Sequence, residues 1–320
     1  MRALVLDREL SLRHDYPNPQ PRLGESIVKV LMAGICGTDL ELARGYMAYR
    51  GVLGHEFVGE VVESADPRLT GRRVAGEINA GCGRCGFCLA AMERHCPHRS
   101  VLGILGRDGC FAGYLRLPDR NLLAVPDSMS DEVAVFTEPV AAACEIFEQT
   151  RIARNAAIAV LGDGRLGAIV AMVLKANEYA AVVGGHHREK LARLSELGIT
   201  AGFEGDLRPG FDVVIDCTGA SAGFARAIDL VRPRGTIVLK STAAAAASLN
   251  LAARLNDIVV NEISIVGSRC GRFAPALDML ASGKLDVTAL ISAVYPLEDG
   301  IAAFAAAADP SNLKVLLKVS

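Results

Sequence analysis

The chain of 320 residues contains no tryptophan, and aromatic residues make up only 5% of it. It has no excess of positive charge, because 34 Lys and Arg residues stand against 36 Asp and Glu residues, for a formal net charge of −2. Nucleic-acid-binding proteins rely on clustered positive charge and stacking side chains. The composition therefore argues against a nucleic-acid partner.

Long apolar segments are missing as well. The amino-terminal stretch MRALVLD reaches a charge at Asp7 after four uninterrupted apolar residues, too few for the core of a signal peptide. No later run reaches the ~18 apolar residues of a membrane-spanning helix, although the mean hydropathy is +0.30. We expect a cytoplasmic protein with no membrane partner and, from its length, about two domains.

The nine cysteines are an odd number, and disulfides rarely persist in a reducing compartment. Four of them follow the spacing C-x2-C-x2-C-x7-C, at Cys82, Cys85, Cys88 and Cys96. Four thiolates so close together can surround one tetrahedral Zn²⁺, and a filled shell leaves no position for a substrate. We expect a structural zinc in a lobe spanning residues 79–99, with an iron–sulfur cluster as the alternative.

A second group of metal-binding residue types lies upstream, in AGICGTDLELARGYMAYRGVLGHEFVGEVVES. Cys36 precedes the pair His55 and Glu56, and glycines punctuate apolar stretches that are typical of strands. Thiolate, imidazole and carboxylate are all zinc ligands, and three protein ligands leave a position open for Lewis-acid catalysis. The same residue types are also common as packed side chains in strand-rich regions.

A nucleotide-binding signature follows in AAIAVLGDGRLGAIVAMVLKANEYAAVVGG. An apolar strand ends at Gly162, the motif G-x-G-x-x-G occupies Gly162, Gly164 and Gly167, and an apolar helix begins at Arg165 and Leu166. The glycines allow a pyrophosphate to approach the helix amino terminus, where free N–H groups favour anions.

The same alternation of apolar runs continues at residues 213–217, 236–239 and 262–266, with space for a helix between runs. It predicts a doubly wound parallel sheet. Two alanine-rich runs are predicted as a loop or helix start (Ala243–Ala247) and as a helix (Ala305–Ala308).

With these three features in this order, the sequence resembles the zinc-containing medium-chain alcohol dehydrogenase superfamily, in its polyol and threonine dehydrogenase branch. The matching motifs are CGTD at Cys36–Asp39, GHE at Gly54–Glu56, the four cysteines, Glu138-Pro139, the glycine motif and GSRCGRFAPALDML. The resemblance implies an α/β architecture in which a Rossmann domain (138–267) is inserted into a GroES-like, β-rich catalytic domain (1–137 and 268–320).

The resemblance also assigns roles. Cys36 and His55 would bind a catalytic zinc, so that the chain would hold two Zn²⁺ ions. Glu56 would be a further ligand or would exchange with the substrate oxygen. Glu138 would supply a carboxylate at or near the metal, although a carboxylate in a first helical turn is also favoured by the helix dipole.

Two neighbours of Cys36 complete the implied site. Asp39 matches the carboxylate that orients the histidine ligand, and Thr38 matches the hydroxyl that takes the proton of the alcohol while hydride passes to the nicotinamide. Many alcohol-oxidising members have a histidine five residues after the cysteine. Glu41 stands there in this chain, so the exit of the proton beyond Thr38 is left open.

We therefore expect an oxidoreductase acting reversibly on a secondary alcohol, polyol or sugar derivative, in a homodimer or homotetramer. A quinone or enoyl reductase of the same superfamily is an alternative, but such relatives usually lack both zinc sites. A catalytically silent relative and a zinc-ribbon module with a nucleotide sensor are further alternatives. The first is disfavoured by the presence of Cys36, Thr38 and His55 together.

The cofactor preference depends on the end of the second nucleotide-domain strand. NAD-specific folds place an acid about 20 residues past the glycine motif, where it binds the ribose 2′-OH. That position is Gly185, and no acid stands there. His186, His187 and Arg188 follow and supply donors suited to a 2′-phosphate. The sequence predicts that NADP is preferred and that NAD is also accepted.

Overall fold

The computed structural model describes residues 1–242 and 251–320, so the alanine run Ala243–Ala247 lies outside the described residues. The chain divides into two compact units. The first is formed by Met1–Glu138 and Arg272–Ser320, and the second by Pro139–Gly271. That these units are separate domains with borders near residues 137 and 268 stays a prediction.

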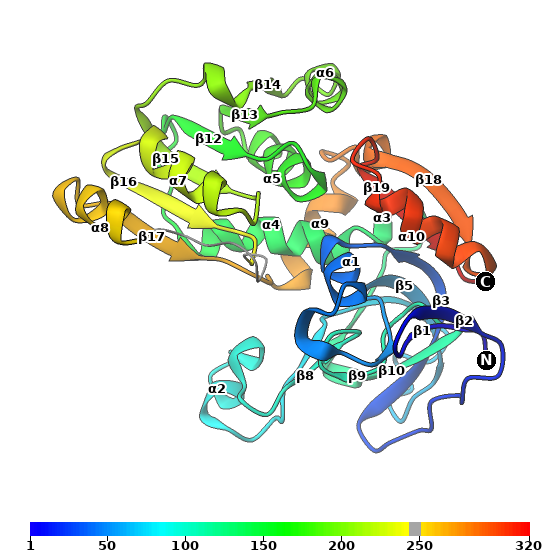
Figure 1. The fold of residues 1–320 in the computed structure, drawn as a ribbon. Helices are drawn as coiled ribbons and strands as arrows, with labels where there is room; N and C mark the ends of the chain where they lie inside the picture. Colours follow the sequence, from blue (N-terminus) through cyan, green and yellow to red (C-terminus); the bar gives the residue numbers. More distant parts are fainter. Residues whose placement is uncertain (243–250) are drawn as a thin grey trace. The chain divides into compact units, whose positions relative to one another are not determined.

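The first unit contains a mixed sheet with the strand order β11-β6-β5-β3-β19-β18, and β10 also pairs with β3. Strand β3 forms because ESIVKVLMAG is a nearly continuous run of apolar residues, several of them β-branched, and it pairs antiparallel with both β5 and the last strand, β19. The two ends of the chain therefore share one sheet (Figure 1). The strands are β3 (Glu25–Gly34), β5 (Glu56–Glu63), β6 (Arg73–Gly76), β10 (Tyr114–Pro118), β11 (Leu122–Ala124), β18 (Ile291–Pro296) and β19 (Lys314–Lys318).

Two small sheets and short helices complete the first unit. The small sheets are β2-β1-β4, with β1 (Ala3–Leu6), β2 (Leu10–Arg13) and β4 (Gly51–Val52), and β7-β8-β9, with β7 (Asn79–Ala80), β8 (Ser100–Leu102) and β9 (Gly106–Arg107). The helices are α1 (Gly37–Ala43), α2 (Gly86–Leu89), α3 (Asp131–Ala134), α9 (Phe273–Ala281) and α10 (Gly300–Ala308), and α10 confirms the helix predicted over Ala305–Ala308.

The second unit is a six-stranded sheet with the order β14-β13-β12-β15-β16-β17, in which every neighbouring pair is parallel (Figure 1). This order is that of a doubly wound dinucleotide-binding fold, as the sequence predicts. The strands are β12 (Ile158–Leu161), β13 (Ala181–Gly185), β14 (Thr200–Phe203), β15 (Phe211–Asp216), β16 (Val231–Leu239) and β17 (Ser264–Gly267). The helices are α4 (Thr137–Gln149), which begins at the border, α5 (Arg165–Ala176), α6 (Arg188–Glu196), α7 (Ser221–Leu230) and α8 (Leu251–Val260).

The register of the parallel strands brings three turns together at one edge of this sheet. Leu161 at the end of β12 pairs with Gly184 on one side and with Asp216 on the other. The residues that follow these strands therefore lie at the carboxyl edge, where open α/β sheets bind their ligands. Buried apolar side chains such as Leu161, Val214 and Ile237 form the core beneath them.

Within the described part of the chain, no helix is both long and apolar enough to cross a membrane.

Candidate active site

Three metal-binding side chains meet in the first unit. Cys36 stands directly before α1, and His55 and Glu56 stand at the start of β5. The pairing of Gly34 with Glu56 between β3 and β5 brings the two segments together. One ligand atom from each of Cys36, His55 and Glu56 lies within 4.8 Å of the others, and both His55 and Glu56 are buried. Sulfur, nitrogen and oxygen donors so placed fit a three-ligand zinc site.

Asp39 holds the trio in place. Its carboxylate is fully buried and accepts hydrogen bonds from the backbone N–H of Cys36 (2.8 Å) and from Nδ1 of His55 (3.2 Å). Because Nδ1 faces the carboxylate, Nε2 of His55 is the nitrogen directed to the metal position. Burial by itself lowers the pKa of His55, but the charge of Asp39 and its hydrogen bond outweigh burial and raise that pKa well above its usual value.

A buried ion pair, which sequence reasoning missed, lies behind Glu56. Nζ of Lys314, on β19, contacts Oε2 of Glu56, and both side chains are almost completely buried. The ammonium group also lies 5.6 Å from the centre of the Phe136 ring. A side chain at Gly34 would overlap both members of the pair, so the glycine is required there. A lysine within the apolar stretch LKVLLKV was the available signal.

Thr38 and Glu138 lie differently relative to the trio. Oγ1 of Thr38 is 3.9 Å from Sγ of Cys36, which places the hydroxyl beside the metal position. Glu138 is buried in the first turn of α4, but it is not a member of the group formed by the other three among the described residues. Its role as a ligand stays a prediction. Glu41 forms an exposed ion pair with Arg44.

The four cysteines of the lobe lie together in the structure. Sγ of Cys85 is 3.6 Å from Sγ of both Cys88 and Cys96, and all four sulfurs fall within 4.8 Å of one another. A disulfide would require about 2.05 Å. The edge of a tetrahedron with Zn–S bonds of 2.3 Å is about 3.8 Å, so the spacing fits one Zn²⁺ held by four thiolates.

The backbone and the burial of the lobe change the pKa values of its cysteines. A hydrogen bond from the backbone N–H of Arg84 lowers the pKa of Cys82 to about 6, whereas burial raises the pKa of Cys88 to about 11. A side chain at Gly81 would lie 2.9 Å from Sγ of Cys88, so the loop can close only around a glycine. A metal ion would therefore have to displace the proton from some of these thiols.

The glycine motif of the second unit forms the expected strand–turn–helix. Gly162 follows β12 with a φ of 106°, and Gly164 caps α5, which begins at Arg165 and Leu166. A side chain at Gly167 would overlap the backbone oxygen of Gly162, so the helix packs against the turn only through a glycine. The N–H groups at this helix start are directed toward the position a pyrophosphate would occupy.

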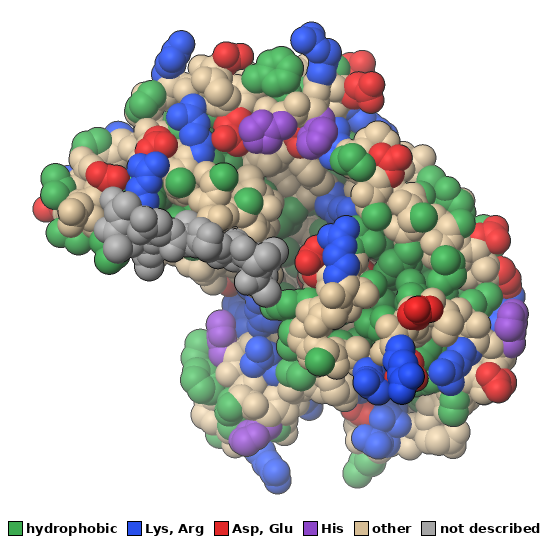
Figure 2. Space-filling view, viewed as in Figure 1, with side chains coloured by type: hydrophobic (Ala, Val, Ile, Leu, Met, Phe, Trp, Pro, Cys, Tyr) green, Lys and Arg blue, Asp and Glu red, His purple; other side chains and the backbone are tan. Residues whose placement is uncertain are grey.

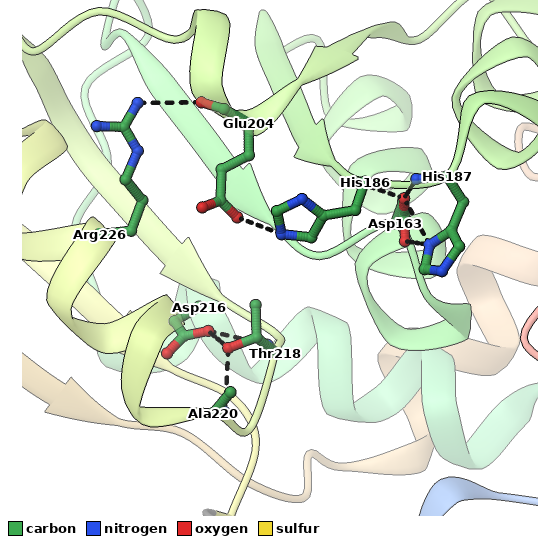
Figure 3. Close-up of polar contacts among 8 residues, drawn as sticks. All are labelled: Asp163, His186, His187, Glu204, Asp216, Thr218, Ala220 and Arg226. Atoms are coloured by element: carbon green, nitrogen blue, oxygen red, sulfur yellow. Dashed lines mark hydrogen bonds and ion pairs between the residues drawn. The ribbon is translucent and has the colours of Figure 1, made fainter.

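Two acids lie against the predicted donors that follow β13, and the prediction of cofactor preference from the sequence did not include them. Asp163, inside the glycine motif, contacts His187, and Oε2 of Glu204 lies 3.4 Å from Nε2 of His186 (Figure 3). The guanidinium of Arg188 lies over the ring of Phe203, 5.6 Å from its centre. The electrostatic character of this turn is thus mixed rather than purely basic.

Comparisons with known proteins agree with this arrangement. The family profile described as an alcohol dehydrogenase GroES-like domain matches residues 22–127, and the profile described as a zinc-binding dehydrogenase matches residues 166–282. The chain is 30% identical to L-threonine 3-dehydrogenase of Streptomyces coelicolor and 29% identical to sorbitol dehydrogenase of Halalkalibacterium halodurans. Each match covers 95% of this chain and 94% of the relative.

Two solved structures are similar over nearly their full length. The alcohol dehydrogenase RspB of Escherichia coli CFT073, in complex with NADH, superposes with a TM-score of 0.89 at 27% identity and covers 100% of this chain and 99% of its own. A zinc-binding dehydrogenase of Sinorhizobium meliloti 1021, bound to NADP, gives 0.90 at 26% identity and 99% coverage of both chains. Together with the two metal clusters and the glycine turn, these matches show that the chain belongs to the zinc-containing medium-chain alcohol dehydrogenase superfamily.

Proposed function

We propose that this zinc-type, NAD(P)-dependent alcohol dehydrogenase acts on a secondary alcohol, a polyol or a sugar derivative, which it oxidises reversibly to the carbonyl compound. Relatives named as sorbitol dehydrogenase, L-threonine 3-dehydrogenase and D-arabitol-phosphate dehydrogenase support this substrate class. Each of the three named substrates is a polar molecule that contains at least one secondary alcohol group. The individual substrate is a property of loops that family membership does not determine.

The observation that carries the proposal is the trio of half-buried Cys36 with buried His55 and Glu56, with a threonine hydroxyl beside it. Four-thiolate sites are closed, as in the lobe, but three mixed ligands leave one position for a substrate oxygen. A zinc ion held there would supply Lewis acidity, which would favour loss of the proton from the substrate hydroxyl.

The residues around the trio each contribute to the reaction. Cys36, His55 and Glu56 would hold the ion, with Glu138 as a fourth candidate. Asp39 fixes the ring of His55 through Nδ1. Oγ1 of Thr38 would accept the hydroxyl proton of the alcohol and release its own proton in turn. The oxygen electron pair then forms the C=O bond as the electron pair of the C–H bond leaves as hydride for the nicotinamide ring.

The second unit would bind the nicotinamide cofactor, which supplies the hydride-accepting ring. We assign the pyrophosphate to the turn Gly162–Gly167, including the N–H groups of Arg165 and Leu166. The adenosine ribose would lie at Gly185 and the residues that follow it. Arg188, three residues after Gly185, is the permanent positive charge nearest in sequence to the proposed ribose position. The preference for NADP over NAD stays a prediction, and the acids Asp163 and Glu204 oppose it.

The distribution of charge does not favour a nucleic-acid-binding function. On the face shown in Figure 2, basic and acidic side chains of the described residues are interspersed, and the net charge is −2. A cytoplasmic location is proposed because nine free thiols suit a reducing compartment. A homodimer or homotetramer is proposed from the family resemblance alone.

The test combines zinc analysis with a substrate screen. Purified protein is assayed against a panel of secondary alcohols, polyols and their phosphates, with NAD and NADP in parallel, by the absorbance of the reduced nicotinamide. We expect zinc-dependent reduction of the cofactor with at least one vicinal diol or polyol. Activity confined to quinones or enoyl compounds would favour the reductase alternative instead.

A further inference from the structure

The turn between β13 and α6 reads the 2′ position of the adenosine ribose in folds of this kind, and here it lacks the usual acid. A side chain at Gly185 has no space. Its Cβ would lie 2.5 Å from Cβ and 2.6 Å from Cγ of Asp163. The volume that an acid at position 185 would fill is therefore occupied by an acid that comes from the glycine motif. The absence of an acid at position 185 and the presence of Asp163 in the glycine motif therefore belong together, because both side chains could not fit.

Asp163 is built into the turn as an ionised group. Only 5% of the residue is exposed, and Oδ2 accepts hydrogen bonds from the backbone N–H groups of His186 (2.8 Å) and His187 (2.7 Å). Burial raises the pKa of Asp163, but these hydrogen bonds and that from the His187 ring outweigh burial and lower the pKa below its usual value. The carboxylate thus stays charged across the neutral range.

The ionised carboxylate also determines which nitrogen of His187 carries the proton. Nδ1 lies 3.0 Å and 3.1 Å from the two carboxylate oxygens, a position in which it must donate. In the neutral ring Nε2 is then the acceptor, and in the protonated ring Nε2 becomes a donor. Figure 3 shows Nε2 on the side of the ring away from Asp163, and the side chain is 49% exposed.

We propose that His187, oriented by Asp163, reads the 2′ substituent of the cofactor, accepting a hydrogen bond from the 2′-OH when neutral and donating one to a 2′-phosphate when protonated. The selectivity for NADP over NAD then rises as the pH falls. This inference rests on the proposed nicotinamide-binding function and adds the residue pair that sets its selectivity. Asp163 is the positioning residue, and His187 is the group that contacts the cofactor.

Other charges surround the pair. The ring of His186 faces Glu204 instead of Asp163, so the neighbouring imidazole is directed to a different acid (Figure 3). Arg165 and Arg188 begin the two helices that follow Asp163 and His187, and an arginine carries a permanent positive charge. His187 is therefore the imidazole that Asp163 orients.

The experiment measures the dissociation constants of NAD and NADP by calorimetry at a series of pH values between about 8 and about 5.5. The 2′-phosphate itself titrates near pH ~6, so wild type is compared with His187→Gln, in which the titration of the ligand is unchanged. Selectivity is the dissociation constant of NAD divided by that of NADP. The selectivity of wild type relative to that of His187→Gln should rise about tenfold between the highest and the lowest pH, the size expected for one additional charge-assisted hydrogen bond.

Asp163→Asn provides an independent measurement. An amide at this position can donate to Nδ1, which places the proton of the neutral ring on Nε2, and it removes a negative charge from the phosphate position. Selectivity at about pH 8 should shift about tenfold toward NADP, and its dependence on pH should weaken. Thermal unfolding checks that this variant folds, and if it does not, His187→Gln decides.

A His187→Gln variant with the full wild-type dependence of selectivity on pH would overturn the inference. So would a folded Asp163→Asn variant with unchanged selectivity. Both results leave the proposed function intact, because both cofactors still bind. Failure of wild type to bind either cofactor would overturn the proposed function and the inference together.

Discussion

The two candidate metal sites of the first unit differ in the types of their ligands and in the parts of the chain that supply them. The lobe takes four identical ligands from one short segment, Cys82 to Cys96, and its loop is held by local turns and glycines. The trio takes three different ligands from two segments, and its supporting groups come from α1 and from the last strand. A site formed by one loop can be closed and structural, whereas a site supported from several elements can hold an open coordination position rigidly.

This difference predicts that substitution of Cys36 or His55 abolishes turnover and leaves the fold nearly intact. In His55→Ala the imidazole ligand is lost, while the strand β5 retains its pairing with β3. We expect no measurable turnover and a melting temperature close to that of wild type. Initial rates and a thermal unfolding curve test both points. Retention of substantial turnover would remove His55 from the catalytic site.

Thr38→Ala should have the next largest effect. Loss of the proton acceptor should lower kcat about 10²–10⁴-fold, the usual contribution of a general acid–base group, while cofactor binding persists. Thr38→Ser is the matched control, because it retains the hydroxyl and should preserve most of the activity. Wild-type turnover in the alanine variant would show that the proton leaves by another route.

Lys314→Met tests the support behind the trio. The substitution leaves the buried carboxylate of Glu56 without its cation, so we expect about 3–5 kcal/mol loss of stability and a loss of zinc affinity or activity of about 10–100-fold. Lys314→Arg retains the charge and should be much milder. The double variant Lys314→Met, Glu56→Gln should recover stability relative to Lys314→Met. Equal stability of the single and double variants would show that the ion pair does not hold Glu56.

Substitutions in the lobe should have the smallest effect on turnover. Cys85→Ser or Cys88→Ser should release the lobe zinc and lower the melting temperature, because Phe87, Leu89 and Met92 are exposed and do not bury the loop without the metal. The fraction of protein that remains folded should retain a turnover number close to that of wild type. Abolished turnover in folded Cys85→Ser would contradict the separation of the two roles.

The same contrast explains what the sequence alone could predict. The lobe was recognised from its spacing because all its ligands are local, and the parallel sheet was recognised from apolar runs interrupted by glycines. Lys314 was missed because it lies 258 residues from Glu56, and only the pairing of β19 with β3 brings them together. Asp163 was missed as a partner of His187 because the rule for cofactor preference considers position 185 alone. The contact depends on the register of β12 against β13.

The number of zinc ions per chain, measured together with turnover in wild type and in Cys36→Ala, decides whether the two metal sites have separate roles. We expect two zinc ions per chain in active wild type. In Cys36→Ala we expect one zinc ion, a nearly unchanged melting temperature and no turnover. Fully active wild-type protein with one zinc ion or none, or a Cys36→Ala variant that still holds two zinc ions and turns over substrate, would contradict these separate roles.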